Sequence, residues 1–198
     1  MTTSQQTLPD QTTPTLNDSE PTGAGAGRVP GGERADLLEA LANQRHFLRF
    51  AARGLGDDQA RQRTTASELT LGGLIKHVSA TERNWAEFIV AGPSALGDFS
   101  AMTEEDLAQR EDEFRLLPEE TLAGVLAEYA EVARRTDELV ATLADLDVSH
   151  ALPAAPWFEE GKRWSARRVL LHIIGETSQH AGHADIIRES LDGARSMA

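Results

Sequence analysis

Three histidines and a glutamate fall close together near the C-terminus of the chain: His172, Glu176, His180 and His183. If this segment is helical, the four side chains lie within an arc of about 80° on its surface, at about 100° per residue. That arc overlaps the apolar side of the same helix. Carboxylate and imidazole groups that face a core are costly unless hydrogen bonds or a bound cation satisfy them. The cluster therefore predicts a paired polar network or part of a metal site.

His77 is the candidate for a further ligand from another part of the chain. It lies in residues 70–91, where apolar residues recur at helical spacing and Thr70 is a typical capping residue. On that helix His77 falls at the border of the apolar face, so we expect it to point inward. With Glu176 and His180 it would complete the three protein ligands of a catalytic metal site, which leaves one position open.

These ligand types suit Zn²⁺, Mn²⁺, Fe²⁺ and Ni²⁺, and they do not choose among the four. The alternative is that the same groups pair with one another without a metal, for example Glu176 with His172. A His-Glu-x-x-His zinc motif is absent. A di-iron carboxylate bundle needs Glu-x-x-His pairs, and Gln179 stands three residues after Glu176. The chain has no cysteine, which excludes thiolate ligands and a cysteine nucleophile.

Helical periodicity predicts the elements that must position these residues. We expect four amphipathic helices, over residues 33–55, 70–91, 118–143 and 165–191, with Thr70, Pro118 and Ser165 at or near their starts and Gly193 as the last stop. No strand pattern of period two is visible. The prediction is an all-α four-helix bundle with long connections after the second and third helices.

The long connections and the chain ends complete the predicted organisation. Residues 94–117 are irregular apart from a helical turn at 103–109, and a connection of this length is often functional or a lid. Residues 1–32 are rich in Thr, Gln, Pro and Gly and are predicted to be a disordered leader. We place the bundle domain at 33–193 and a short C-terminal tail at 194–198.

Charge and hydropathy exclude several classes of partner. The net charge of −13 disfavours nucleic acids and anionic membranes, because both require a basic face. No apolar run approaches the roughly 20 residues that span a bilayer. The N-terminus lacks the pattern of a signal peptide, so we expect a cytoplasmic protein, as a monomer or a homodimer.

Two segments carry a resemblance to a known family: LGGLIKHVSATERNW at residues 71–85 and ETSQHAGHAD at 176–185. Together they resemble the DinB-like four-helix metalloprotein superfamily, and within it the branch of mycothiol-dependent S-transferases. The resemblance extends over about residues 33–193. It implies that His77, Glu176 and His180 are the metal ligands, with zinc as the first expectation and Mn, Fe or Ni as alternatives.

The resemblance also implies a reaction, the conjugation of mycothiol to small electrophiles in detoxification. A cation with one open position would lower the pKa of a thiol from its usual value near ~8.5. His183 is a candidate proton acceptor, with a structural role beside Glu176 as the alternative. His172, Asp185 and Trp85 are expected around the site or pocket, and Glu82 as a pairing residue. The other functions considered are a thiol-dependent isomerase, a metal-dependent hydrolase and a non-enzymatic metal-binding stress protein.

Overall fold

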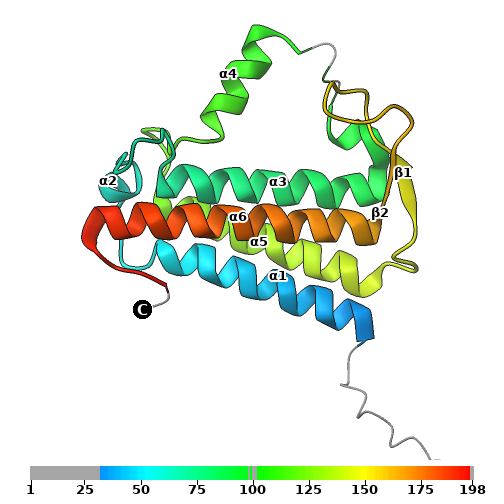
Figure 1. Ribbon diagram of the computed structural model, residues 1–198, viewed down its shortest axis with the longest axis horizontal. Helices are drawn as coiled ribbons and strands as arrows, with labels where there is room; N and C mark the ends of the chain where they lie inside the picture. The colour runs from blue at the N-terminus through cyan, green and yellow to red at the C-terminus, as the bar shows by residue number, and fades with distance from the viewer. Residues whose placement is uncertain (1–31, 98, 100–101, 197–198) are drawn as a thin grey trace, which may run out of the picture. The chain divides into compact units, whose positions relative to one another are not determined.

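The computed structural model describes residues 32–97, 99 and 102–196, and four long helices form its body (Figure 1). These helices are α1 (Gly32–Ala51), α3 (Leu71–Ala91), α5 (Leu122–Thr142) and α6 (Ala166–Asp192). Short elements lie between them: α2 (Asp57–Ala60), the 3-10 helix η1 (Gly92–Ala95), α4 (Glu104–Asp112), β1 (Ser149–Ala151) and β2 (Arg163–Ser165). The predicted four-helix bundle with two long connections is confirmed. Of the predicted leader, only Gly32 is among the described residues.

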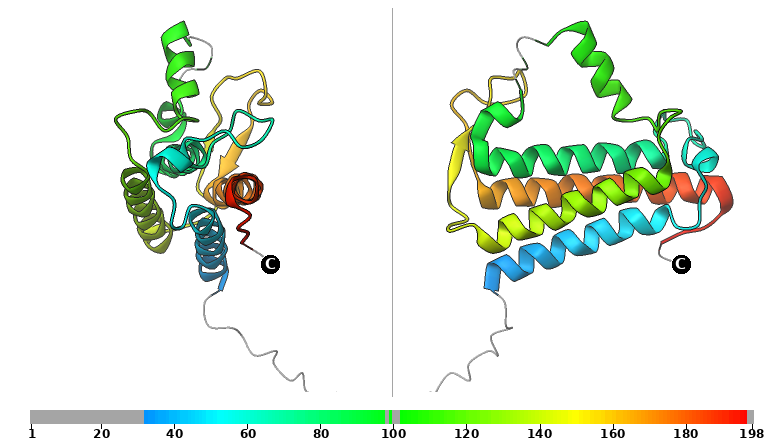
Figure 2. Two further views of the ribbon diagram at one scale, coloured as in Figure 1. Left: turned by 90° about the vertical axis from the view of Figure 1, so that its left-hand side faces the viewer. Right: turned by 180° about the vertical axis from the view of Figure 1, so that it is seen from behind.

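The direction of the helices explains one long connection. α1 packs beside α6 and α3 lies between α5 and α6, while α3 and α5 run in the same direction (Figures 1 and 2). The chain must therefore return along the bundle between the end of α3 and the start of α5. It does so through η1 and α4, and α4 stands away from the four long helices (Figure 1).

Capping side chains define where three of the helices begin. The hydroxyl groups of Thr70, Thr121 and Ser165 each accept a hydrogen bond from the backbone N–H three residues later. The predicted starts at Thr70 and Ser165 are thus confirmed, as is the stop at Gly193, which adopts φ 78°. The predicted start at Pro118 is wrong, because the cap of α5 is Thr121.

Local predictions failed where elements are short. The first helix ends at Ala51, ahead of the predicted residue 55, and α4 extends beyond the predicted turn at 103–109. The two strands were not predicted. Each has three residues, too few to show a period-two pattern, and His150 of β1 pairs with Trp164 of β2 in an antiparallel register. None of the helices in the described part of the chain is long and apolar enough to cross a membrane.

The core consists of two apolar clusters, with polar residues between them along each helix. One cluster includes Leu48, Leu74 and Tyr129, and the other includes Leu41 and Phe88. The buried polar side chains that lie between them in the sequence of the four long helices are Arg45, Ser79, Glu82, Thr136, Thr177 and His180.

An ion pair between α1 and α3 occupies this polar layer. Arg45 is 2% exposed and Glu82 is fully buried. The guanidinium donates from Nε to Oε2 of Glu82 at 3.1 Å and from Nη2 to Oε1 at 2.5 Å, and its Nη1 reaches Asp137 of α5 at 2.8 Å. Glu82 is therefore a pairing residue of the interior. Phe47 of α1 is 37% exposed, and Arg45 takes the inner face of the helix.

Removing one partner of this pair should strongly destabilise the protein. In Arg45→Ala the carboxylate of Glu82 stays buried without its cation, and we expect unfolding to become easier by about 3–5 kcal/mol. Arg83→Ala is the matched control, because Arg83 pairs with Glu128 at the surface and its loss should cost below about 1 kcal/mol. Chemical denaturation at pH 7 measures both. Equal, small effects of the two substitutions would contradict this role for Arg45.

Candidate metal centre

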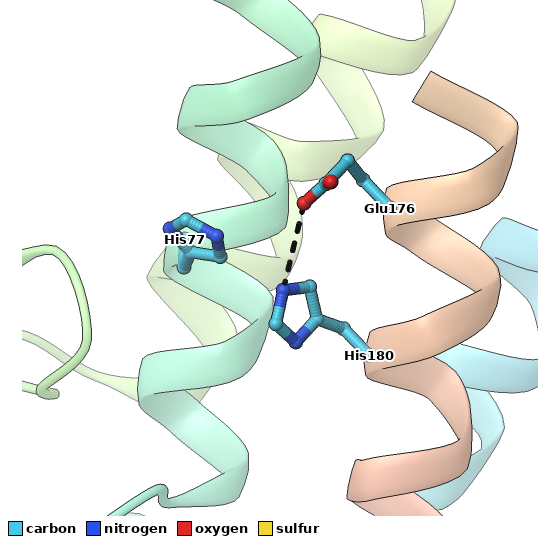
Figure 3. A group of neighbouring side chains, drawn as sticks. All are labelled: His77, Glu176 and His180. Atoms are coloured by element: carbon cyan, nitrogen blue, oxygen red, sulfur yellow. Dashed lines mark ion pairs between the residues drawn. The ribbon is translucent and has the colours of Figure 1, made fainter. Parts of the chain in front are cut away.

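Three side chains from two neighbouring helices converge on one point (Figure 3). α3 contributes His77, and α6 contributes Glu176 and His180, which stand one turn apart on the same face. Each offers a ligand atom, and these atoms all lie within 4.8 Å of one another. Oε2 of Glu176 and Nε2 of His180 are 3.8 Å apart. Among the described residues this is the one cluster of three or more such groups.

Burial keeps the two imidazoles in the form that binds metals. Burial lowers the pKa of His77 to about 4, with smaller contributions from His180 and Arg110. Burial also lowers the pKa of His180, and His183 adds to the effect. Both rings are therefore neutral at pH 7, so each has one unprotonated nitrogen whose lone pair can bind a metal.

The cluster lacks the internal partners that buried polar groups require. Nδ1 of His77 is buried and has no hydrogen-bond partner among the described residues. The separation of 3.8 Å between Glu176 and His180 is too long for a hydrogen bond, so the carboxylate does not satisfy that ring. A divalent cation among the three groups would satisfy them together, and the residues present therefore fit one.

The other predicted histidines lie next to this cluster, on either side of it along α6. Nδ1 of His172 is 4.0 Å from Oε1 of Glu176, and its ring contacts Trp85 and Trp164 edge-on. Nδ1 of His183 is 3.4 Å from Nδ1 of His180. In this arrangement His183 contacts His180, whereas the sequence suggested a contact with Glu176.

The sequence candidate Asp185 is not brought to the cluster, and neither is Arg167 of the same helix. The carboxylate of Asp185 accepts a hydrogen bond from the backbone N–H of Ser196, at 2.7 Å, in the C-terminal segment. Arg167, near the start of α6, pairs with Glu33 and Asp147. Both side chains stabilise the fold at sites apart from the three converging residues.

A pocket of about 680 Å³ opens beside the cluster, and His77 and Glu176 form part of its wall. Its volume lies within the range of small-molecule sites. Trp85 of α3 lines it, together with Thr81 and Asn84 from the same face of that helix. The long connections supply most of the rest, including Arg110 of α4, Glu113 just after α4 and Trp157 between the two strands.

The segment after α4 packs directly on the cluster, and this contact was not predicted from the sequence. The ring of Phe114 stacks on His77, with centroids 4.0 Å apart and an angle of 22° between the planes. Gly73 allows this approach, because a Cβ there would lie 1.8 Å from the carbonyl oxygen of Phe114. Lys76 also binds the connection through Glu120 at 2.7 Å. Adjacent Gly72 and Gly73 at the start of a helix were the signal of this close packing.

The fold and the converging residues define a class: a four-helix bundle with a candidate site of two histidines and one glutamate. Residues 36–193 match the family model described as mycothiol-S-transferase, and the chain belongs to this family. A search of curated proteins gave no match.

A solved structure supports the fold. It is described as "YfiT from Bacillus subtilis is a probable metal-dependent hydrolase with an unusual four-helix bundle topology". The two chains are 14% identical and superpose with a TM-score of 0.58, over 81% of this chain and 89% of the other. At this identity the likeness concerns the fold alone.

Two glycine substitutions should have opposite effects on stability. Gly73→Ala places a methyl group against the backbone of Phe114, so the segment that covers His77 must move, at a cost of about 1–3 kcal/mol. Gly175 lies on α6 beside Glu176, and among the described residues nothing packs within 4 Å of a Cβ added there. Gly175→Ala should stabilise the helix by about 0.5–1 kcal/mol. Thermal unfolding distinguishes them, and a stabilising Gly73→Ala would contradict the close packing of Phe114.

Proposed function

We propose that this protein is a metal-dependent S-transferase that joins mycothiol, or a similar small thiol, to small electrophiles. The observation that carries the proposal is the convergence of His77, Glu176 and His180 beside a pocket of about 680 Å³, whose wall includes His77 and Glu176. The family to which the chain belongs is named for the same reaction.

In this proposal His77, Glu176 and His180 hold a divalent cation, with zinc as the first expectation and Mn, Fe or Ni as alternatives. The cation would supply Lewis acidity, which lowers the pKa of a thiol from near ~8.5. In the reaction the sulfur forms a bond to carbon, the leaving group departs with the electron pair of the broken bond, and the thiol proton is released. His183, in contact with His180, is the candidate acceptor of that proton.

The residues of the pocket would position the two substrates. Thr81 and Asn84 offer hydrogen bonds to a polar thiol along the same face of α3 as His77. His172 and Trp85 pack against each other beside Glu176 and hold the wall of the site in place. The absence of cysteine from the chain means that no protein thiol competes for the site.

The chemistry of the cluster favours an enzyme over a metal-storage or stress protein. A closed structural site uses four protein ligands, and His172 and His183 are the candidates for a fourth. Among the described residues neither belongs to the cluster of ligand atoms, since each contacts only one of its members. Three ligands beside a pocket leave a position for a substrate. A hydrolase or an isomerase on the same site is the second candidate.

Glu176→Ala should abolish metal binding and thioether formation together while leaving the bundle folded, because Glu176 is partly exposed at the pocket. His46→Ala is the control, since His46 is an exposed histidine on the outer side of α1. Elemental analysis of the purified proteins gives the metal content and its identity. Circular dichroism checks the fold.

Mass spectrometry of the products separates the candidate functions. Incubation with mycothiol and an electrophile should yield the thioether with wild type and His46→Ala and none with Glu176→Ala. An isomerase would return the thiol unchanged, and a hydrolase would act without it. Full metal content in Glu176→Ala, or a wild-type protein that binds no metal under any loading, would overturn the proposal.

A further inference from the structure

A line of aromatic rings runs along the pocket beside the candidate metal centre. Successive ring centroids are 6.5 Å apart from Trp85 to Phe158, 6.0 Å from Phe158 to Trp157 and 5.2 Å from Trp157 to Phe99. All four side chains line the pocket, and we call them the aromatic row. They come from α3 and from both long connections, so the fold gathers them from distant parts of the sequence.

The two ends of the row have different surroundings. Trp85 is 9% exposed and is fixed by Trp164, whose ring stacks on it at 4.8 Å, and by the edge of His172. Trp157 is 61% exposed, although it is one of the largest apolar side chains in the protein. An exposed tryptophan that lines a pocket offers an aromatic face to a ligand at little cost in conformational entropy.

The row is also close to where the reaction would occur. Trp85 contacts His172, with ring centroids 4.8 Å apart, and His172 lies 4.0 Å from the carboxylate of Glu176. Thr81 and Asn84 lie one and two turns along α3 from His77 and make the neighbouring wall polar. Groups that can form hydrogen bonds thus lie beside the aromatic row, and His77 and Glu176 line the same pocket.

We propose that the aromatic row binds the electrophile, and that the preferred electrophiles carry a planar aromatic group. This inference rests on the proposed function. Thr81 and Asn84 are left for the thiol, whose hydroxyl and amide groups require hydrogen bonds. With a haloarene as substrate, the sulfur of the thiol bonds to the ring carbon, the carbon–halogen bond breaks, the halide leaves with the electron pair, and the thiol proton passes to His183, the candidate acceptor.

Binding of an unreactive aromatic probe tests the row without any thiol. Calorimetry with 2,4-dinitroaniline and the metal-loaded protein should detect binding to wild type. Trp157→Ala should weaken binding by about 3- to 10-fold, the range expected for one stacking contact. Trp157→Phe should restore it to within about twofold. Phe47→Ala, which removes an exposed aromatic ring from α1, is the control and should bind as wild type does.

Kinetics with two electrophiles then show which substrate the row recognises. With mycothiol, Trp157→Ala should lower kcat/KM for 1-chloro-2,4-dinitrobenzene by the same factor and leave that for iodoacetamide unchanged. The chain has no cysteine for either reagent to alkylate. An equal loss for both electrophiles would assign the row to the thiol and overturn the inference.

Two remaining outcomes separate this inference from the proposed function. If 2,4-dinitroaniline binds wild type and Trp157→Ala equally well, or binds neither, the aromatic subsite is refuted even where thioethers form. If binding depends on Trp157 but no thioether forms with either electrophile, the transferase function fails, and the row stands as a binding site for aromatic compounds.

Discussion

The free-energy cost of burying ionisable groups governs the middle of this bundle. Each such group needs a partner in the folded state, because water is no longer available to it. Two clusters in the bundle differ in how far they meet this requirement. Arg45 and Glu82 satisfy each other through two hydrogen bonds, with Asp137 as a third partner. His77, Glu176 and His180 approach one another without forming such bonds. The difference separates a structural ion pair from a candidate metal centre.

The pocket follows from the connectivity of the helices. Because α3 and α5 run in the same direction, the chain between them must pass along the bundle (Figure 1). This passage carries Phe114 onto His77 and brings Phe99 and Arg110 to the pocket. The second long connection adds Trp157 and Phe158 from between the two strands. A bundle with short turns throughout would leave the three candidate ligands on an open surface, accessible to bulk water.

The sequence was sufficient to predict the helices and the convergence of their polar side chains. Glu176 and His180 share a helical face by spacing alone, and the inward position of His77 follows from the apolar pattern of its helix. The caps at Thr70 and Ser165 were equally local features. Such predictions succeed because they depend on residues within one or two turns.

Contacts between distant segments could not be predicted in this way. The partner of Glu82 is Arg45, and nothing in the pattern of either helix identified that pair, since a buried arginine resembles a solvent-facing one in sequence. The stacking of Phe114 on His77 and the aromatic row depend on how the long connections fold. Asp185 belongs to the same motif as Glu176, but its side chain leaves the helix in another direction. Its carboxylate accepts a hydrogen bond from the backbone N–H of Ser196.

X-ray absorption spectroscopy of the metal-loaded protein tests the candidate metal centre directly, because it identifies and counts the ligand atoms around the metal. We expect two imidazole nitrogens and carboxylate oxygen from one side chain around the metal. A small thiol should occupy a remaining position, with a metal–sulfur distance of about 2.3 Å for zinc. A fourth protein ligand, or a set of metal ligands that saturating thiol leaves unchanged, would contradict a three-residue centre with an open position.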